Sequence, residues 1–345
     1  MTAAGGDEAG YFRLAEMIYD LKLQRHTWTL GFPLAVTPFL FVFGPRFEDV
    51  FLPIVIFNGF ILYGAAIALV VWGAWMVFGR VLAAFWSGFL FSFFPVVFYI
   101  FRDFGPHFSG GTWNDGNFVH ANWLSWMSDP LSSFFTLSIF CLLLWSLKRD
   151  SGLPFYSFLG FLGGYSMMVR LSNIVVLAIV GAVILWRFEW KKLLFFSAFS
   201  MLGFLPQLMY NSAFFGSPIK FGYQQEYVSW IAIGAAARPI FSIENFMHLV
   251  ARATQYSWLA IPAFIFIAGI AALGAYSIIR RNRLYGFIVL AWFLGPTLFY
   301  IFFTTGQTTM RYYFPAVPAF ILLGVGAVLW TMERIRALKA PVSLP

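Results

Sequence analysis

The sequence predicts an all-α, polytopic transmembrane bundle of about nine helices, with interfacial helices in its outer loops. Hydrophobic residues make up 61% of the 345 positions and charged residues only 10%. Since a soluble domain has about 25% charged residues, most of this surface must face lipid. The formal net charge is +8. The cations form short clusters between apolar runs, which is typical of membrane proteins and not of a nucleic-acid-binding groove.

The apolar runs give the expected spans, because a helix needs about 20 apolar residues to cross a bilayer. They lie at 52–78, 81–101, 130–147, 155–169, 172–186, 193–209, 258–279, 284–303 and 312–332. Two of them, 155–169 and 172–186, are short, and they could instead form one long helix through Arg170.

The charges between the spans indicate that the chain reverses near Arg170. With a reversal there, one side of the membrane receives three acids and twelve cations. These cations are Arg80, Lys148, Arg149, Arg187, Lys191, Lys192, Arg280, Arg281, Arg283, Arg334, Arg336 and Lys339. Without the reversal, the later clusters would lie opposite the earlier ones. A cation excess marks the cytoplasmic side. We therefore expect a multi-pass protein of the inner or plasma membrane, with its long loops outside.

The extracytoplasmic loops are then 1–51, 102–129, 210–257 and 304–311, and 52–345 forms the transmembrane bundle. In the first loop, the run from Ala9 to Arg25 has apolar residues at helical spacing, which predicts a helix along the membrane surface.

Two further outer segments are expected to stay at the interface. Residues 30–44 are apolar but too short, at about 15 residues, to cross a bilayer, and they contain two prolines. We therefore expect a re-entrant or interfacial element there. The segment from Ser242 to Tyr256 is expected to form a second interfacial helix, in the loop 210–257.

Charged residues at five outer positions are candidates for chemistry, and each has an ordinary structural alternative. Asp7 and Glu8 begin a helix, and Asp129 begins a span before a proline, so these acids could cap helices or complement their dipoles. Arg170 lies between two apolar runs and must reach the interface, pair with an acid or bind an anion. Arg311 begins the last span beside two tyrosines, as an interfacial anchor does.

No cofactor is indicated with certainty, although a divalent cation is possible. The loop 102–129 holds several aspartates with His107 and His120, but the two histidines are 13 positions apart and lack helical ligand spacing. Cys141 is the only cysteine, which excludes an intrachain disulfide and a cysteine-based metal site. No Gly-rich phosphate loop and no metalloprotease or serine-hydrolase motif is present.

Several short patterns on the outer side share one order along the chain. They are Asp7-Glu8 with Gly31-Phe32-Pro33, Ser128-Asp129-Pro130, the glycine-rich run ending in Val169-Arg170, Tyr210-Asn211 through Gly222-Tyr223, and Arg311-Tyr312 with Pro315 and Pro318. In this order they resemble the GT-C superfamily of membrane glycosyltransferases, above all the aminoarabinose transferases and the protein O-mannosyltransferases. The resemblance covers nearly the whole chain, although no single pattern is specific.

The resemblance implies a glycosyltransferase that moves a sugar from a polyprenyl- or dolichyl-phosphate donor to an acceptor glycan, lipid or protein on the outer face. Such a donor needs no nucleotide-binding domain. The matching positions imply Asp7 as the general base with Glu8 as support, and Arg170 and Arg311 as cations for the donor phosphate. Asp129 would either orient Arg170 or hold a divalent ion.

The chain departs from the family in one respect. A complete span usually precedes the acidic pair, whereas six residues precede Asp7 here. We therefore expect the sequence upstream of Met1 to encode a hydrophobic stretch of about 20 residues.

Two other functional classes stay open. One is a non-enzymatic membrane protein, either a transporter or a lipid-binding scaffold, and the other is an inactive member of the family. A transporter usually has ionisable residues near the bilayer midplane. The spans here are almost free of charge, and the acids gather on one side, which favours the enzyme.

Overall fold

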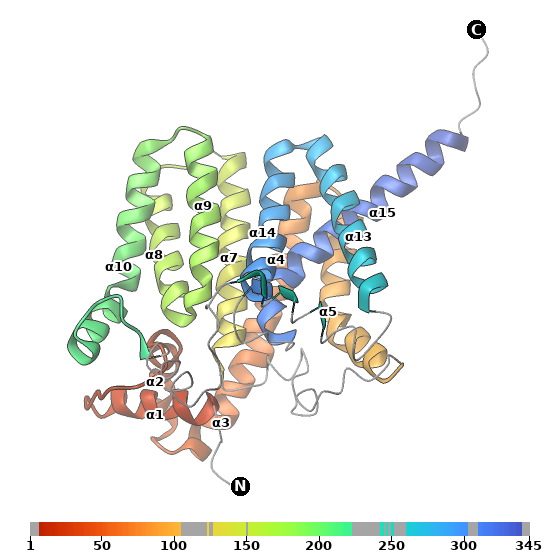
Figure 1. Cartoon of the computed structure of the whole chain (residues 1–345). Helices are drawn as coiled ribbons and strands as arrows, with labels where there is room; N and C mark the ends of the chain where they lie inside the picture. Colours follow the sequence, from red (N-terminus) through yellow and green to blue (C-terminus); the bar gives the residue numbers. More distant parts are fainter. Residues whose placement is uncertain are drawn as a thin grey trace.

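The computed structural model describes residues 7–104, 123, 127–149, 151–222, 242–244, 246–247, 250–251, 260–302 and 310–339, and these residues contain no strand. The helices are α1 (Asp7–Tyr19), α2 (Gly31–Phe43), α3 (Phe47–Ile56), η1 (Phe57–Leu62), α4 (Tyr63–Phe78), α5 (Val81–Phe104), α7 (Ser128–Lys148), α8 (Leu153–Val169), η2 (Leu171–Asn173), α9 (Ile174–Trp186), α10 (Trp190–Phe215), α13 (Ala260–Arg281), α14 (Arg283–Phe302), η3 (Met310–Ala316) and α15 (Val317–Lys339). The long helices stand side by side, and α1 lies across one end of the bundle (Figure 1).

The predicted all-α membrane fold is confirmed, because each predicted span corresponds to a helix of the bundle. Among the described residues, five helices are long and apolar enough to cross a membrane. They are Phe47–Phe78, Ser128–Lys148, Trp190–Phe215, Arg283–Phe302 and Tyr313–Leu338. The two spans recognised as short, α8 and α9, are indeed shorter apolar helices.

The helix is interrupted at Arg170, where the charge pattern predicted that the chain reverses. Arg170 is extended (φ −152°, ψ 120°), and the short 3₁₀ turn η2 joins α8 to α9. The Asn173 side chain closes this turn by donating from Nδ2 to the Ser166 carbonyl at 3.0 Å. Two separate helices therefore leave this point and stand side by side (Figure 1).

The surface helix α1 ends earlier than predicted, at Tyr19 instead of Arg25. Leu21 has a left-handed backbone (φ 56°). The amides of Leu21 and Lys22 bond back to the carbonyls of Ile18 and Met17, at 3.1 and 2.8 Å. This pattern is a Schellman motif, which normally has glycine at the left-handed position. The helix end was missed because leucine gives no such signal.

The segment that follows α1 forms a short helix, as its length predicted. α2 has 13 residues, which at about 1.5 Å per residue is too short to cross a bilayer. The first span begins at Phe47, five residues before the predicted start, because Glu48 and Asp49 in its first turn complement the helix dipole. The predicted interfacial helix Ser242–Tyr256 lies partly outside the described residues.

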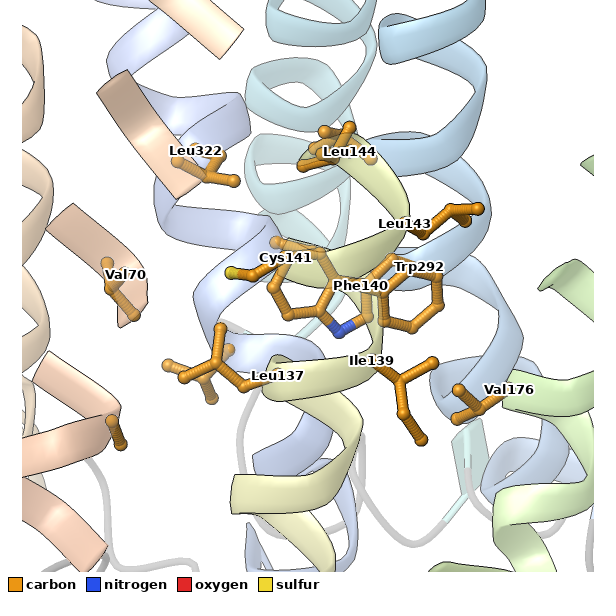
Figure 2. Close-up of a cluster of buried hydrophobic side chains, with 14 of the residues drawn as sticks. Val70, Leu137, Ile139, Phe140, Cys141, Leu143, Leu144, Val176, Trp292 and Leu322 are labelled. Carbon is orange, nitrogen blue, oxygen red and sulfur yellow. The ribbon is translucent and has the colours of Figure 1, made fainter. Parts of the chain in front are cut away.

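The core of the bundle is centred on two stacked rings from α7 and α14. The rings of Phe140 and Trp292 lie 4.7 Å apart at 15°. Figure 2 shows them at the centre of a buried cluster, with Val70 on one side and Val176 on the other. The Trp292 indole N–H donates to the Pro315 carbonyl at 2.8 Å. This bond ties η3 to α14 and satisfies a buried polar group.

Helices α8 and α10 approach so closely that only glycine fits between them. A Cβ added to Gly164 would lie 2.0 Å from the Ser200 carbonyl oxygen, and one added to Gly203 would lie 2.3 Å from the Phe161 carbonyl oxygen. Small residues of this kind let membrane helices pack backbone to backbone, where dispersion contacts hold them together.

Gly164→Ala is therefore expected to lower the free energy of unfolding by about 1–3 kcal/mol, since the two helices must move apart. Gly269→Ala is the matched control, because a Cβ at this α13 glycine meets nothing within 4 Å. Thermal unfolding in detergent measures both variants. A Gly269→Ala loss as large as that of Gly164→Ala would show that the packing argument is wrong.

Candidate active site

An ion pair between Asp129 and Arg170 lies where α7 begins and α8 ends. The Arg170 Nη1 donates to Oδ1 of Asp129. The Asp129 side chain is 5% exposed and that of Arg170 is 16% exposed. Little water screens the two charges, so the pairing is strong and either charge alone would be costly. Of the two roles that the sequence left open for Asp129, the geometry accords with orienting Arg170.

A second pair of side chains, about one helical turn further along α7, joins α7 to the turn η2 that follows Arg170. The Asn173 Nδ2 donates to Ser132 Oγ at 2.9 Å. Both residues are buried. Since Ser132 is on α7 and Asn173 is in η2, this bond holds the Asp129 and Arg170 backbones in register.

The ring of Tyr300, from α14, lies against the guanidinium of Arg170. The Arg170 Cζ is 5.7 Å from the ring centroid, which is within the range of a cation–π contact. The Tyr300 hydroxyl donates to Ser172 Oγ at 2.6 Å. Tyr300 therefore contacts both the side chain of Arg170 and the turn that follows it.

Helix α1, which carries the acidic pair, is bonded to the start of α7. The hydroxyls of Tyr11 and Ser128 are 2.9 Å apart, and both residues are buried. Ser128 precedes Asp129, and Asp7 lies about one helical turn before Tyr11. The side chain of Asp7 lies outside the described part of the structure, while Glu8 is partly buried.

The connection between α1 and α2 is hydrogen-bonded to α8 and α10. The Leu30 amide donates to Oε1 of Gln207 at 2.8 Å. The Thr29 hydroxyl donates to the carbonyl of Val169, the residue before Arg170, at 3.2 Å. These bonds link the N-terminal unit, which consists of α1, α2 and the connection between them, to α10 and α8.

Two titratable groups of this N-terminal unit are perturbed by burial. Burial raises the pKa of Glu16, with a further rise from Asp20 and an opposing effect of Arg13. Burial also lowers the pKa of His26, and the Arg13 charge adds to the effect. Glu16 and His26 are accordingly half-buried, whereas residues 20–25 between them are exposed.

Arg311 lies in η3, and its side chain is outside the described part of the structure. Two contacts place η3 beside the site. The Pro315 carbonyl accepts the Trp292 bond, and the ring of Tyr313 lies 6.2 Å from that of Tyr300. The elements that carry all the predicted site residues therefore meet at the α1 end of the bundle, although direct contact is described only for Asp129 and Arg170.

The described residues contain no group of three or more His, Cys, Asp or Glu side chains that could hold a metal ion. His107 and His120 lie outside the described residues. The cation described at this place, Arg170, is held in a fixed position by Asp129.

No protein-family model matches the chain, and no curated protein matches its sequence. Its structure is similar to that of the oligosaccharyltransferase AglB from Archaeoglobus fulgidus, with a TM-score of 0.59 and 16% identity over 99% of this chain. It is also similar to ArnT from Cupriavidus metallidurans, with a TM-score of 0.58 and 14% identity over 96% of this chain. Both are glycosyltransferases of the GT-C superfamily. The chain has the GT-C glycosyltransferase fold.

The fold is thus that of the superfamily which the sequence patterns resemble. The chain spans about half the length of the solved proteins, covering 49% of AglB and 58% of ArnT. The AglB structure contains an inhibitory peptide and a dolichol-phosphate. The ArnT structure contains undecaprenyl phosphate.

The sequence did not predict the contacts that Tyr300 and Tyr11 make at the candidate site. The sequence patterns predict no chemical role for any of the fifteen tyrosines. Two signals were available. Tyr300 lies near the end of its predicted span on the same side as Arg170, and Tyr11 lies about one turn after the acidic pair on an expected helix.

Proposed function

We propose that this chain is a glycosyltransferase that takes a sugar from a polyprenyl- or dolichyl-phosphate donor and transfers it to an acceptor on the extracytoplasmic face of the cell membrane. The observation that carries the proposal is the partly buried Arg170, paired with the buried Asp129, in a GT-C fold. The solved proteins with this fold contain dolichol-phosphate and undecaprenyl phosphate, whose anionic headgroups are the ligands that a fixed arginine recognises.

The proposed reaction is an inverting substitution at the anomeric carbon. The acceptor attacks this carbon while Asp7 takes the acceptor's proton, and the bond between the sugar and the phosphate oxygen breaks. The lipid phosphate leaves with the bonding electrons. Arg170 stabilises the negative charge that develops on it, with Arg311 as the second cation and Glu8 as a supporting acid.

The proposed role requires the cation of Arg170 to lie at the edge of an apolar bundle. The carboxylate of Asp129 offsets much of the desolvation free energy of the guanidinium, so the cation can stay at membrane depth without a bound ligand. The guanidinium has five N–H donors in one plane. It can therefore contact a carboxylate and a phosphate oxygen through different N–H groups.

Transfer from a polyprenyl-phosphate sugar in proteoliposomes tests the proposal. We expect the wild-type protein to release polyprenyl phosphate as it glycosylates the acceptor. Arg170→Gln should weaken donor use by about 10- to 100-fold, because it removes a charge-assisted bond to phosphate worth about 1.5–3 kcal/mol.

Arg281→Gln is the matched control, since its partner Glu333 lies at the opposite, exposed end of the bundle, where ion pairs contribute little. Equal loss in both variants would argue against a donor site at Arg170. Binding of polyprenyl phosphate by the wild-type protein without transfer of any sugar would instead identify a lipid-binding scaffold or an inactive family member.

A further inference from the structure

The guanidinium of Arg170 is held in two independent directions. The Asp129 carboxylate holds it at Nη1, in the plane of the group. The Arg170 Cζ lies over the Tyr300 ring, 5.7 Å from its centroid. An ion pair alone lets a guanidinium rotate about the bond direction, whereas the attraction of a fixed ring on another side favours some of these orientations over others.

Tyr300 is itself well anchored. It is only 6% exposed. Its hydroxyl bond to Ser172 ties it to the turn that carries the Arg170 backbone. Its ring also packs edge-on against Tyr313, with centroids 6.2 Å apart and planes at 69°. Tyr313 is two residues after Arg311 in η3. One side chain thus connects the elements of both proposed phosphate-binding cations.

We infer that Tyr300 is a positioning residue that sets the plane of the Arg170 guanidinium for the lipid phosphate. This inference rests on the proposed function. Arginine binds phosphate through N–H groups that lie in one plane, so the strength of the contact depends on the orientation of that plane. Tyr300 acts through Arg170 and takes no part in the bond changes.

The test compares how tightly the full-length protein in nanodiscs binds polyprenyl phosphate and the uncharged polyprenol of the same length. The ratio of the two affinities is the phosphate preference, and it is measured without catalysis. Tyr300→Leu removes the ring and is expected to lower the preference by about tenfold, which lies between the values for exposed and desolvated cation–π contacts. Tyr300→Phe keeps the ring and should stay within about twofold of the wild type.

A double-mutant cycle separates a positioning role from a structural one. In an Arg170→Gln background, Tyr300→Leu should change the phosphate preference by less than about twofold, because the group that it positions is gone. Phe287→Leu is the matched control, an aromatic-to-leucine change on the same helix. Phe287 pairs with Trp186 about 20 Å from Tyr300, given 1.5 Å per residue.

The outcomes separate the inference from the proposed function. Equal effects of Tyr300→Leu with and without Arg170 would overturn the inference, and so would an unchanged preference in a folded Tyr300→Leu protein. If Tyr300→Leu does not fold, a Tyr300→Phe preference as low as that of Arg170→Gln would overturn it. A wild-type protein that transfers sugar and shows the preference keeps the proposed function intact in each case. A wild-type protein with no phosphate preference would overturn both.

Discussion

Replacing Asp7 with asparagine is expected to lower the rate of sugar transfer by about a hundredfold or more, because the variant has no carboxylate to accept the acceptor's proton. The expectation follows from the proposed role of Asp7 as the base and from its position at the start of α1. Tyr11 of the same helix is hydrogen-bonded to Ser128, the residue before Asp129. Turnover at saturating donor and acceptor measures it, and donor affinity should change little.

Asparagine is a deliberate choice, because it separates the chemical role of Asp7 from its structural alternative. Asparagine caps helices about as well as aspartate, so a residue that only caps α1 would tolerate the change. Glu8→Gln provides the comparison at the neighbouring position, where we expect a smaller loss of turnover. Full activity of Asp7→Asn would leave the acid with a capping role and would remove it from the mechanism.

Replacing Asp129 with leucine is expected to lower the free energy of unfolding by about 3 kcal/mol, since the largely shielded guanidinium of Arg170 would then lack its carboxylate. The pair is well shielded, with 5% and 16% of the two side chains exposed. Thermal or denaturant unfolding in detergent provides the measurement.

The double variant Asp129→Leu with Arg170→Met gives the matched control. Apolar residues of similar size often replace a buried ion pair at no cost, so the double variant should regain most of the lost stability. It should nevertheless fail to use the lipid-phosphate donor, because the cation is absent. Recovery of stability together with donor use would show that the pair is structural only.

Some features of this protein follow from local properties of the chain. The apolar run lengths and the cation clusters between them predicted the helical spans and the break at Arg170, because the bilayer imposes a minimum helix length and a charge asymmetry on any sequence. The sequence motifs likewise predicted which helix ends form the candidate site, namely those at Asp7, Asp129, Arg170 and Arg311. The end of α1 escaped prediction because a leucine takes a backbone conformation that usually marks glycine.

The contacts of the candidate site were decided only by the tertiary structure. Arg170 could have reached the interface or met an acid, and its pairing with Asp129, 41 positions away, depends on how α7 and α8 are rotated against each other. Tyr300 is 128 positions from Ser172 and looks, in sequence, like any other tyrosine near the end of a span. Helix rotation is set by close packing along whole interfaces, such as the glycine contacts of α8 with α10. Packing of that kind is a property of pairs of surfaces, so no single segment of the sequence contains it.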